Sequence, residues 1–149
     1  MGLDAMLALK GSEIGVSEWI MIDQPMIDAF ATVTRDDQFQ HVDHKRAVAA
    51  GFGSTIAHGM LTLSLFRAMY LSSGGAELEN ISVAINYGLN KVRFIREVPV
   101  GTRVRGRFTL VDLTPRGADG FMQTLELVVE REGEAQPAMV AEFLILLRP

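Results

Sequence analysis

An acidic residue and a histidine, Asp36 and His41, stand five positions apart. This spacing puts two side chains about 140° apart on a continuous helix and on opposite faces of a strand. They can therefore converge only on irregular backbone, which often carries functional groups. A carboxylate and an imidazole held together can orient one water molecule, take a proton from it and deliver a proton elsewhere. From the residue types alone, a helix end with an exposed Asp36 and a packed His41 is the more common arrangement.

A second group of residues with possible chemistry surrounds Gly59, at the start of an apolar stretch. Backbone N–H groups in the first turn of a helix lack intrahelical acceptors, and the helix dipole adds partial positive charge there. The N–H of Gly59 could stabilise an enolate-like thioester oxygen, and the missing Cβ would let that oxygen approach. Close packing alone would also explain a glycine. His58 is either a second chemical group or, more commonly at a helix start, a structural histidine, and His44 is expected to be solvated.

The elements that must position these groups fall mainly in the first half of the chain. A short strand is expected over 17–23, and Pro25 suits the first turn of a helix that continues to Thr34. Asp43 can cap a short helix through residue 50, which glycines then end. Residues 57–73 are apolar around nearly the whole circumference, which predicts one long buried helix.

The second half of the chain has the period of two that is typical of strands, predicted at 102–112, 121–130 and 138–147. In the first of these, apolar and basic side chains alternate: Val104, Phe108 and Leu110 against Arg103, Arg105 and Arg107. The arginine row is either a solvated outer face, which we favour, or a contact for a coenzyme A phosphate. Antiparallel strands after one buried helix predict an α+β domain, with a strongly curved sheet and a second subunit to cover the helix.

Two segments resemble a known family. Residues 36–41 read DDQFQH, and residues 52–60 read FGSTIAHGM. Together they resemble the MaoC-like hydratases of the hot-dog fold, whose signature is approximately D-x-N-P-x-H followed by F-G-x-x-I-x-H-G-M. The match is closer to the nodulation-protein-N-like branch, where Gln and an aromatic residue replace the Asn-Pro pair. Residues 85–94, INYGLNKVRF, also look like that branch.

The resemblance implies a hydro-lyase that interconverts a trans-2-enoyl thioester and an (R)-3-hydroxyacyl thioester. It implies that Asp36 and His41 are the catalytic acid–base pair and that Gly59 faces the thioester carbonyl. Substrate contacts are expected from four further motif residues: Phe39, Gly53, His58 and Met60. No metal or redox cofactor is expected, and coenzyme A or a carrier protein enters only as part of the substrate. The resemblance also implies a homodimer with active sites near the subunit interface.

Two rival functions stay open. A thioesterase on the same fold would direct water at the thioester carbonyl instead of the β-carbon. A non-catalytic module that binds acyl thioesters or a partner would tolerate loss of Asp36 or His41, and both are present.

Composition limits the remaining possibilities. The chain has 149 residues, which suits a single domain over 1–149. Its net charge of −4 gives no support to nucleic-acid or anionic-membrane binding. No stretch approaches the roughly 20 apolar residues that span a bilayer. The absence of cysteine excludes a thiolate site and fits the reducing cytoplasm, where we expect the protein.

Overall fold

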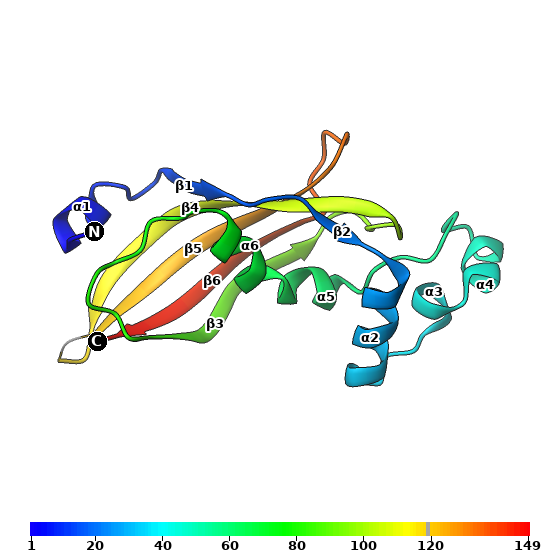
Figure 1. The fold of residues 1–149 in the computed structure, drawn as a ribbon, viewed down its shortest axis with the longest axis horizontal. Coiled ribbons are helices and arrows are strands. Elements are labelled where there is room, and N and C mark those ends of the chain that lie inside the picture. Colours follow the sequence, from blue (N-terminus) through cyan, green and yellow to red (C-terminus); the bar gives the residue numbers. More distant parts are fainter. Residues whose placement is uncertain (119) are drawn as a thin grey trace.

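The computed structural model describes residues 1–118 and 120–149. Within them, antiparallel strands form one sheet in the order β1-β4-β5-β6-β3, and β2 also pairs with β4 (Figure 1). The strands are β1 (Glu13–Val16), β2 (Ile20–Ile22), β3 (Val83–Phe94), β4 (Thr102–Arg116), β5 (Gly120–Arg131) and β6 (Met139–Arg148). The three predicted strands correspond to β4, β5 and β6, and this part of the prediction is confirmed.

The strand predicted over 17–23 is shorter than expected. Only its centre, Ile20–Ile22, is β2, and a separate strand, β1, precedes it. Both pair with β4, where Val16 is opposite Arg107 and Ile22 is opposite Thr102. Strands of three or four residues contain too few alternations for a periodic pattern to show their ends.

The two faces of β4 differ as its alternating sequence predicts. Val104, Phe108 and Leu110 are fully buried. The three arginines on the other face form ion pairs with acidic residues of neighbouring segments: Arg103 with Glu132, Arg105 with Glu130, and Arg107 with Glu13. The arginine row is therefore part of an ion-paired outer face of the sheet.

The stretch predicted as one helix over 57–73 is two short helices, α5 (Gly59–Ser64) and α6 (Phe66–Ser72). Leu65 joins them with φ −73° and ψ −3°, outside regular α-helical geometry. The hydroxyl of Ser64 donates to the carbonyl oxygen of Met60 at 2.7 Å. A serine that bonds back to residue i−4 in this way often bends a helix. The prediction of one uninterrupted helix is corrected accordingly.

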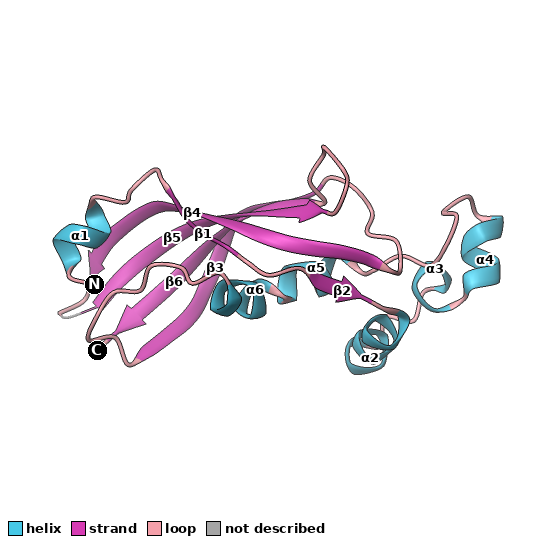
Figure 2. Ribbon diagram, turned by 45° about the horizontal axis from the view of Figure 1, so that its top comes forward, coloured by secondary structure: helices cyan, strands magenta, loops and turns pink. Residues whose placement is uncertain are grey.

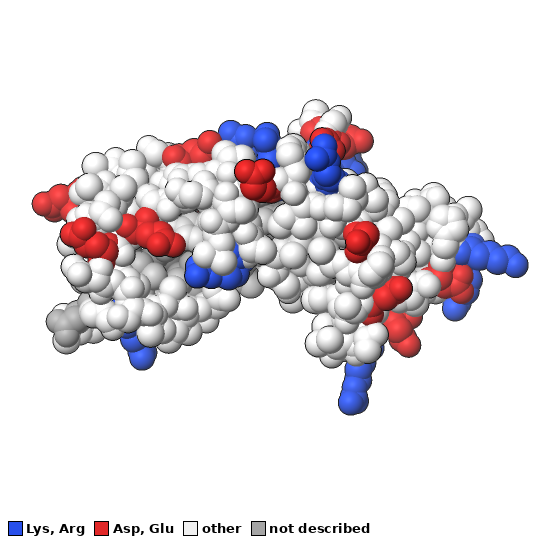
Figure 3. All heavy atoms as spheres, in the orientation of Figure 1, with Lys and Arg blue, Asp and Glu red and all other residues white. Residues whose placement is uncertain are grey.

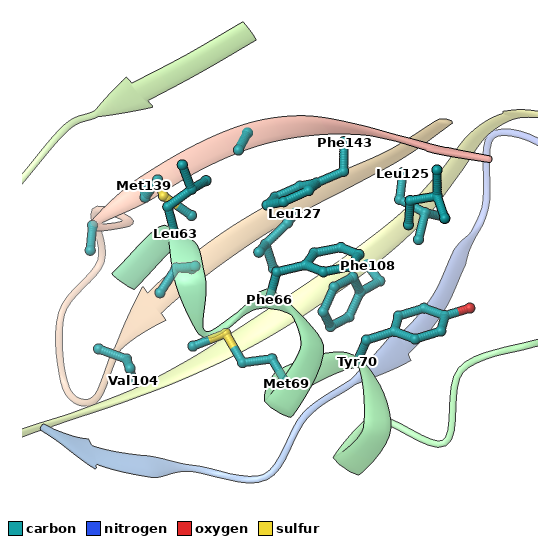
Figure 4. Packing of buried hydrophobic residues seen from close by; sticks show 14 of the residues in the cluster. Leu63, Phe66, Met69, Tyr70, Val104, Phe108, Leu125, Leu127, Met139 and Phe143 are labelled. Carbon is teal, nitrogen blue, oxygen red and sulfur yellow. The ribbon is translucent and has the colours of Figure 1, made fainter. Parts of the chain in front are cut away.

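Within the single chain, burial of α5 and α6 is one-sided, whereas we expected coverage on every side with the help of a second subunit. Leu63 and Phe66 face the sheet and are 7% and 5% exposed, whereas Met60 and Leu71 are 55% and 60% exposed. Figure 4 shows Phe66 between the helix layer and the sheet, where its ring stacks on Phe143 with centroids 4.0 Å apart. The single chain thus covers one side of the helix pair.

Gly106 on β4 lets α6 approach the sheet closely. A Cβ at this position would lie 2.7 Å from Leu127 Cδ1 and 3.1 Å from the sulfur of Met69. Such contacts are too short for the packed core to accept without displacement. The glycine therefore sets the distance between the helix layer and the sheet at the centre of the molecule.

Three helices extend beyond one end of the sheet (Figures 1 and 2): α2 (Gln24–Thr34), α3 (Phe39–Val42) and α4 (His44–Ala49). Helix α1 (Leu3–Leu7) lies at the opposite end of the sheet. Asp23 caps α2 by accepting from the N–H of Met26 at 2.9 Å. Asp43 caps α4 by accepting from the N–H of Arg46 at 3.0 Å. The predicted helix from Pro25 and the predicted cap at Asp43 are both confirmed.

The surface view shows acidic and basic side chains intermixed over one face, with no large continuous basic area there (Figure 3). In the described ranges, no helix has the length and apolarity needed to cross a membrane.

Candidate active site

The backbone turns sharply before the predicted acid–base pair. Helix α2 ends at Arg35, whose φ of 59° and ψ of 28° are left-handed, and this redirects the chain at Asp36. A four-residue helix, α3, then carries His41, which is only 7% exposed. This is the irregular backbone that the five-residue spacing requires, and it lets Asp36 and His41 converge.

The tautomer of His41 follows from its hydrogen bond. Its Nδ1 lies 2.8 Å from the carbonyl oxygen of Ile56. Because a carbonyl oxygen only accepts, Nδ1 carries the hydrogen and donates it, and Nε2 keeps a free lone pair in the neutral ring. His41 is therefore oriented as a base whose reactive atom is Nε2.

His58 connects the loop at Asp36 to the start of α5. Its Nε2 donates to the carbonyl oxygen of Asp36 at 2.8 Å, and its ring is 3% exposed. The ring stacks on His41 with centroids 3.7 Å apart and an interplanar angle of 22°, and it also contacts Phe30. His58 thereby holds the acidic loop against the imidazole of His41.

Asp36, His41 and His58 each have a potential ligand atom within 4.8 Å of the others. That spacing alone suits a metal ion as well as an acid–base group. The two imidazoles, however, are stacked nearly parallel, so their in-plane lone pairs lie in neighbouring planes. A bound metal requires lone pairs that point at one centre. The arrangement therefore fits proton transfer better than metal binding.

The pKa of His41 is lowered from its ordinary value of 6.5. Burial is the main cause, because it disfavours the charged ring, and the neighbouring His58 acts in the same direction. The Ile56 carbonyl and the Asp36 carboxylate oppose the shift. His41 is therefore neutral near pH 7, the form that can accept a proton.

A buried network fixes the main chain of His41. The side-chain amide of Gln24 donates to the carbonyl oxygen of His41 at 2.8 Å, and Gln24 in turn accepts from the hydroxyl of Thr55 at 2.5 Å. Sequence reasoning did not find Gln24 or Thr55. Thr55 lies within the second motif and Gln24 lies twelve positions before the first, and nothing in the sequence pairs positions 24, 41 and 55.

A cavity of about 250 Å³ opens beside His41 and is lined by residues that include Gly59, Thr62 and Phe94. The helix start at Gly59 thus shares a cavity with the imidazole, as the proposed chemistry requires. A Cβ on Gly59 would lie 2.8–3.0 Å from the ring of Phe94. Because Gly59 has no Cβ, another group can approach it closely, and in this structure that group is the ring of Phe94. Sequence reasoning did not identify Phe94 as a site residue.

The four residues expected to contact substrate do not gather around the cavity beside His41. His58 is buried behind His41, and Phe39 is half-buried with the guanidinium of Arg46 4.7 Å from its ring centre. Gly53 is exposed, with a φ of 78°, and Met60 is exposed on α5. None of these four lines the cavity beside His41 in the described residues. Their role in substrate binding stays a prediction.

A larger cavity of about 460 Å³ lies at the other end of the helix pair, between Tyr70 of α6 and Gln123 of β5. Burial raises the pKa of Tyr70 to about 12, and its hydroxyl donates to the carbonyl oxygen of Ala76. Among the described residues no histidine lines this cavity, so the site beside His41 is the candidate active site.

This chain is similar in sequence to proteins of known families. A family model described as a MaoC-like domain matches residues 7–132. The chain is 48% identical over 139 residues to nodulation protein N of Rhizobium leguminosarum bv. viciae, which covers 93% of this chain and 86% of that protein. It is 44% identical over 142 residues to 3-hydroxyacyl-thioester dehydratase Z of Mycobacterium tuberculosis, covering 93% of this chain and 90% of that protein.

A solved structure of an (R)-hydratase from A. caviae involved in PHA biosynthesis has a similar backbone. It superposes with a TM-score of 0.70 at 22% identity, covering 89% of this chain and 95% of that chain. At this identity the likeness concerns the fold alone. The α+β hot-dog fold predicted from the sequence is thereby confirmed.

Proposed function

Because this chain belongs to the MaoC-like dehydratase domain family, we propose that it interconverts trans-2-enoyl and (R)-3-hydroxyacyl thioesters. The acyl group is carried by coenzyme A or by a carrier protein. The observation that carries the proposal is the convergence of Asp36 and His41, together with the cavity that His41 and Gly59 line. The relative named as a 3-hydroxyacyl-thioester dehydratase supports the same reaction class.

In the hydration direction, Asp36 and His41 hold a water molecule next to C3 of the enoyl thioester. His41 Nε2 accepts a proton from this water as its oxygen bonds to C3. The electron pair of the C2–C3 double bond moves toward the thioester, and the N–H of Gly59 stabilises the resulting enolate oxygen. The protonated imidazole then supplies a proton to C2, directly or by way of the Asp36 carboxylate, so that water is added across the bond and both groups return to their starting states. Dehydration runs the steps in reverse.

Because addition of water changes no overall oxidation state, the proposed reaction includes no redox cofactor, and in our proposal Asp36 and His41 activate the water in place of a metal ion. The lowered pKa of His41 supports the role, since it keeps Nε2 available as a base at neutral pH.

The chemistry is tested by following the absorbance of conjugated enoyl-CoA esters with wild-type protein and with Asp36→Asn, His41→Gln and the double variant. Each single change is expected to lower turnover by on the order of 10²–10⁴, the usual effect of removing a positioned acid or base. The double variant should be little worse than either single variant, because groups that act as a unit are not additive.

Circular dichroism serves as the folding control. Near-wild-type turnover in folded Asp36→Asn or His41→Gln would falsify the assignment. Release of free thiol from the same esters would instead favour the thioesterase, and an inactive wild type that still binds acyl-CoA would favour the binding module.

We also propose that the protein works as a homodimer through β3. Among the described residues, this edge strand pairs only with β6, so its other side has unpaired backbone groups. It also exposes large apolar side chains: Val83, Ile85, Tyr87, Leu89 and Phe94. Long apolar edge strands favour pairing with another chain, and a second copy can do so symmetrically. Because Phe94 also lines the catalytic cavity, the partner would lie beside the active site.

A further inference from the structure

A buried hydroxyl beside the active site has no hydrogen-bond partner among the described residues. It is Oγ1 of Thr62, a residue that is 2% exposed and lines the cavity together with His41 and Gly59. Burying a hydroxyl without a partner is unfavourable, because the bonds that it made to water are lost. Such a group at the wall of a reactive cavity suggests that its partner is the substrate.

The position of Thr62 on α5 relates it to Gly59. Residues three apart share a helix face, and the rise between them is roughly 4.5 Å. Helical side chains also lean toward the helix N-terminus, which brings the Thr62 side chain back over the turn that begins at Gly59. The free N–H of Gly59 and the hydroxyl of Thr62 therefore face the same end of the cavity.

Phe94 lines the cavity next to Gly59. Its ring lies against Gly59 and is 50% exposed, at the end of an edge strand. Half of the ring is exposed in the single chain, which leaves it room to turn away from Gly59 when a ligand enters. Displacement would open the space between Gly59 and Thr62.

We propose that Thr62 is a second oxyanion donor, whose hydroxyl donates to the thioester carbonyl oxygen beside the N–H of Gly59. This inference rests on the proposed function. Two donors aimed at one oxygen stabilise the charge that develops on it better than a single backbone N–H does. Thr62 is then a catalytic residue, and its unpartnered state in the free protein is the preorganised state of the site.

The test compares Thr62→Val, which keeps the shape and removes the hydroxyl, with Thr62→Ser, which keeps the hydroxyl. Thr62→Val is expected to lower kcat for enoyl-CoA hydration by on the order of 10²-fold with little change in KM, because the bond strengthens in the transition state. Thr62→Ser should retain kcat within a few-fold. Thr109→Val on the outer face of β4 is the matched control and should keep wild-type kcat.

Thermal unfolding supplies a second measurement that does not depend on activity. Because the Thr62 hydroxyl has no partner in the free protein, Thr62→Val should unfold at the same temperature as wild type or higher. Thr55→Val removes a hydroxyl that donates to Gln24 and should lower the unfolding temperature. Thr62→Ala is a second variant that should show the same loss of kcat if the valine variant folds poorly.

Three results would overturn the inference: an unchanged kcat in Thr62→Val, a raised KM with unchanged kcat, or a fall in unfolding temperature as large as that of Thr55→Val. The first two exclude a transition-state bond, and the third shows that the hydroxyl has a structural partner. A wild type that hydrates no enoyl-CoA would overturn the proposed function itself, and the inference with it. An active wild type with an unaffected Thr62→Val variant would overturn only the inference.

Discussion

At the scale of single residues, the protonation state of His41 decides whether its ring can accept a proton. The Ile56 carbonyl fixes the tautomer, burial keeps the ring neutral, and the stacked His58 disfavours a positive charge next to its own ring. The carboxylate of Asp36 acts in the opposite direction and limits the shift. The pKa of the base is thus set by burial and by groups from both motif segments, residues 36–41 and 52–60.

The lowered pKa predicts the pH dependence of both activity and stability. The neutral ring is the active form, so the acidic limb of kcat/KM should lie below pH 6.5. As the pH falls, His41 becomes protonated at a higher pH in the unfolded chain than in the folded protein. The stability contributed by neutral His41 is therefore fully present above pH 6.5 and is lost as the pH falls through the lowered folded pKa.

Replacing His58 with Gln tests the cause of this shift. The variant removes the second imidazole, whose electrostatic effect lowers the pKa of His41, so the acidic limb should move toward higher pH. Rate profiles of wild type and His58→Gln between pH 5 and 8 decide the matter. An acidic limb at the same pH in both proteins would show that His58 does not contribute to the shift.

At the scale of elements, the short helices beyond the sheet depend on their caps. Helices α3 and α4 have four and six residues, and helices this short are unstable without tertiary contacts and capped ends. Asp43 ends α3 by donating its backbone N–H to the carbonyl oxygen of Phe39, and it begins α4 by accepting from the N–H of Arg46 with its carboxylate. The cap therefore supports the segment that holds His41.

Removing this cap should destabilise the protein. Asp43→Ala is expected to lower the free energy of unfolding by about 1 kcal/mol, and Asp43→Asn, which keeps an acceptor, by much less. Urea denaturation followed by circular dichroism measures both, with exposed Asp37 replaced by Ala as the control. Equal stability of Asp43→Ala and wild type would mean that packing against α2 and α3 holds α4 without the cap.

At the scale of the whole molecule, the uncovered edge of the sheet decides assembly. The chain has enough strands to cover one side of α5 and α6, and it leaves apolar side chains of β3 exposed. Exposed apolar area of this kind, next to unpaired backbone groups, marks an interaction surface. A second copy paired along β3 would cover it.

The dimer is tested by sedimentation at micromolar concentration. Wild type should sediment at twice the mass of the 16.4 kDa chain, and Leu89→Lys, which puts a charge on the β3 surface, should shift it toward the monomer. Val33→Lys is the matched control, since Val33 is 84% exposed on α2 and away from β3. A wild type that sediments as a single chain would contradict the proposal.

The sequence by itself determined the features that depend on local chemistry. The alternation in β4 specified which face is buried, Pro25 and Asp43 marked helix starts, and the two motifs identified the family. Each of these signals lies within a few residues of the structure that it specifies. Backbone geometry and side-chain period act over that range, so they can be recognised without a tertiary structure.

Only the tertiary structure decided how distant groups meet. The stack of His41 on His58, the support of His41 by Gln24 and Thr55, and the contact of Phe94 with Gly59 join segments up to 35 positions apart. The bend at Leu65, next to the hydrogen bond from Ser64 to Met60, was likewise not evident from the sequence. These contacts depend on which surfaces pack together, and the spacing of residues along the chain holds no information about that.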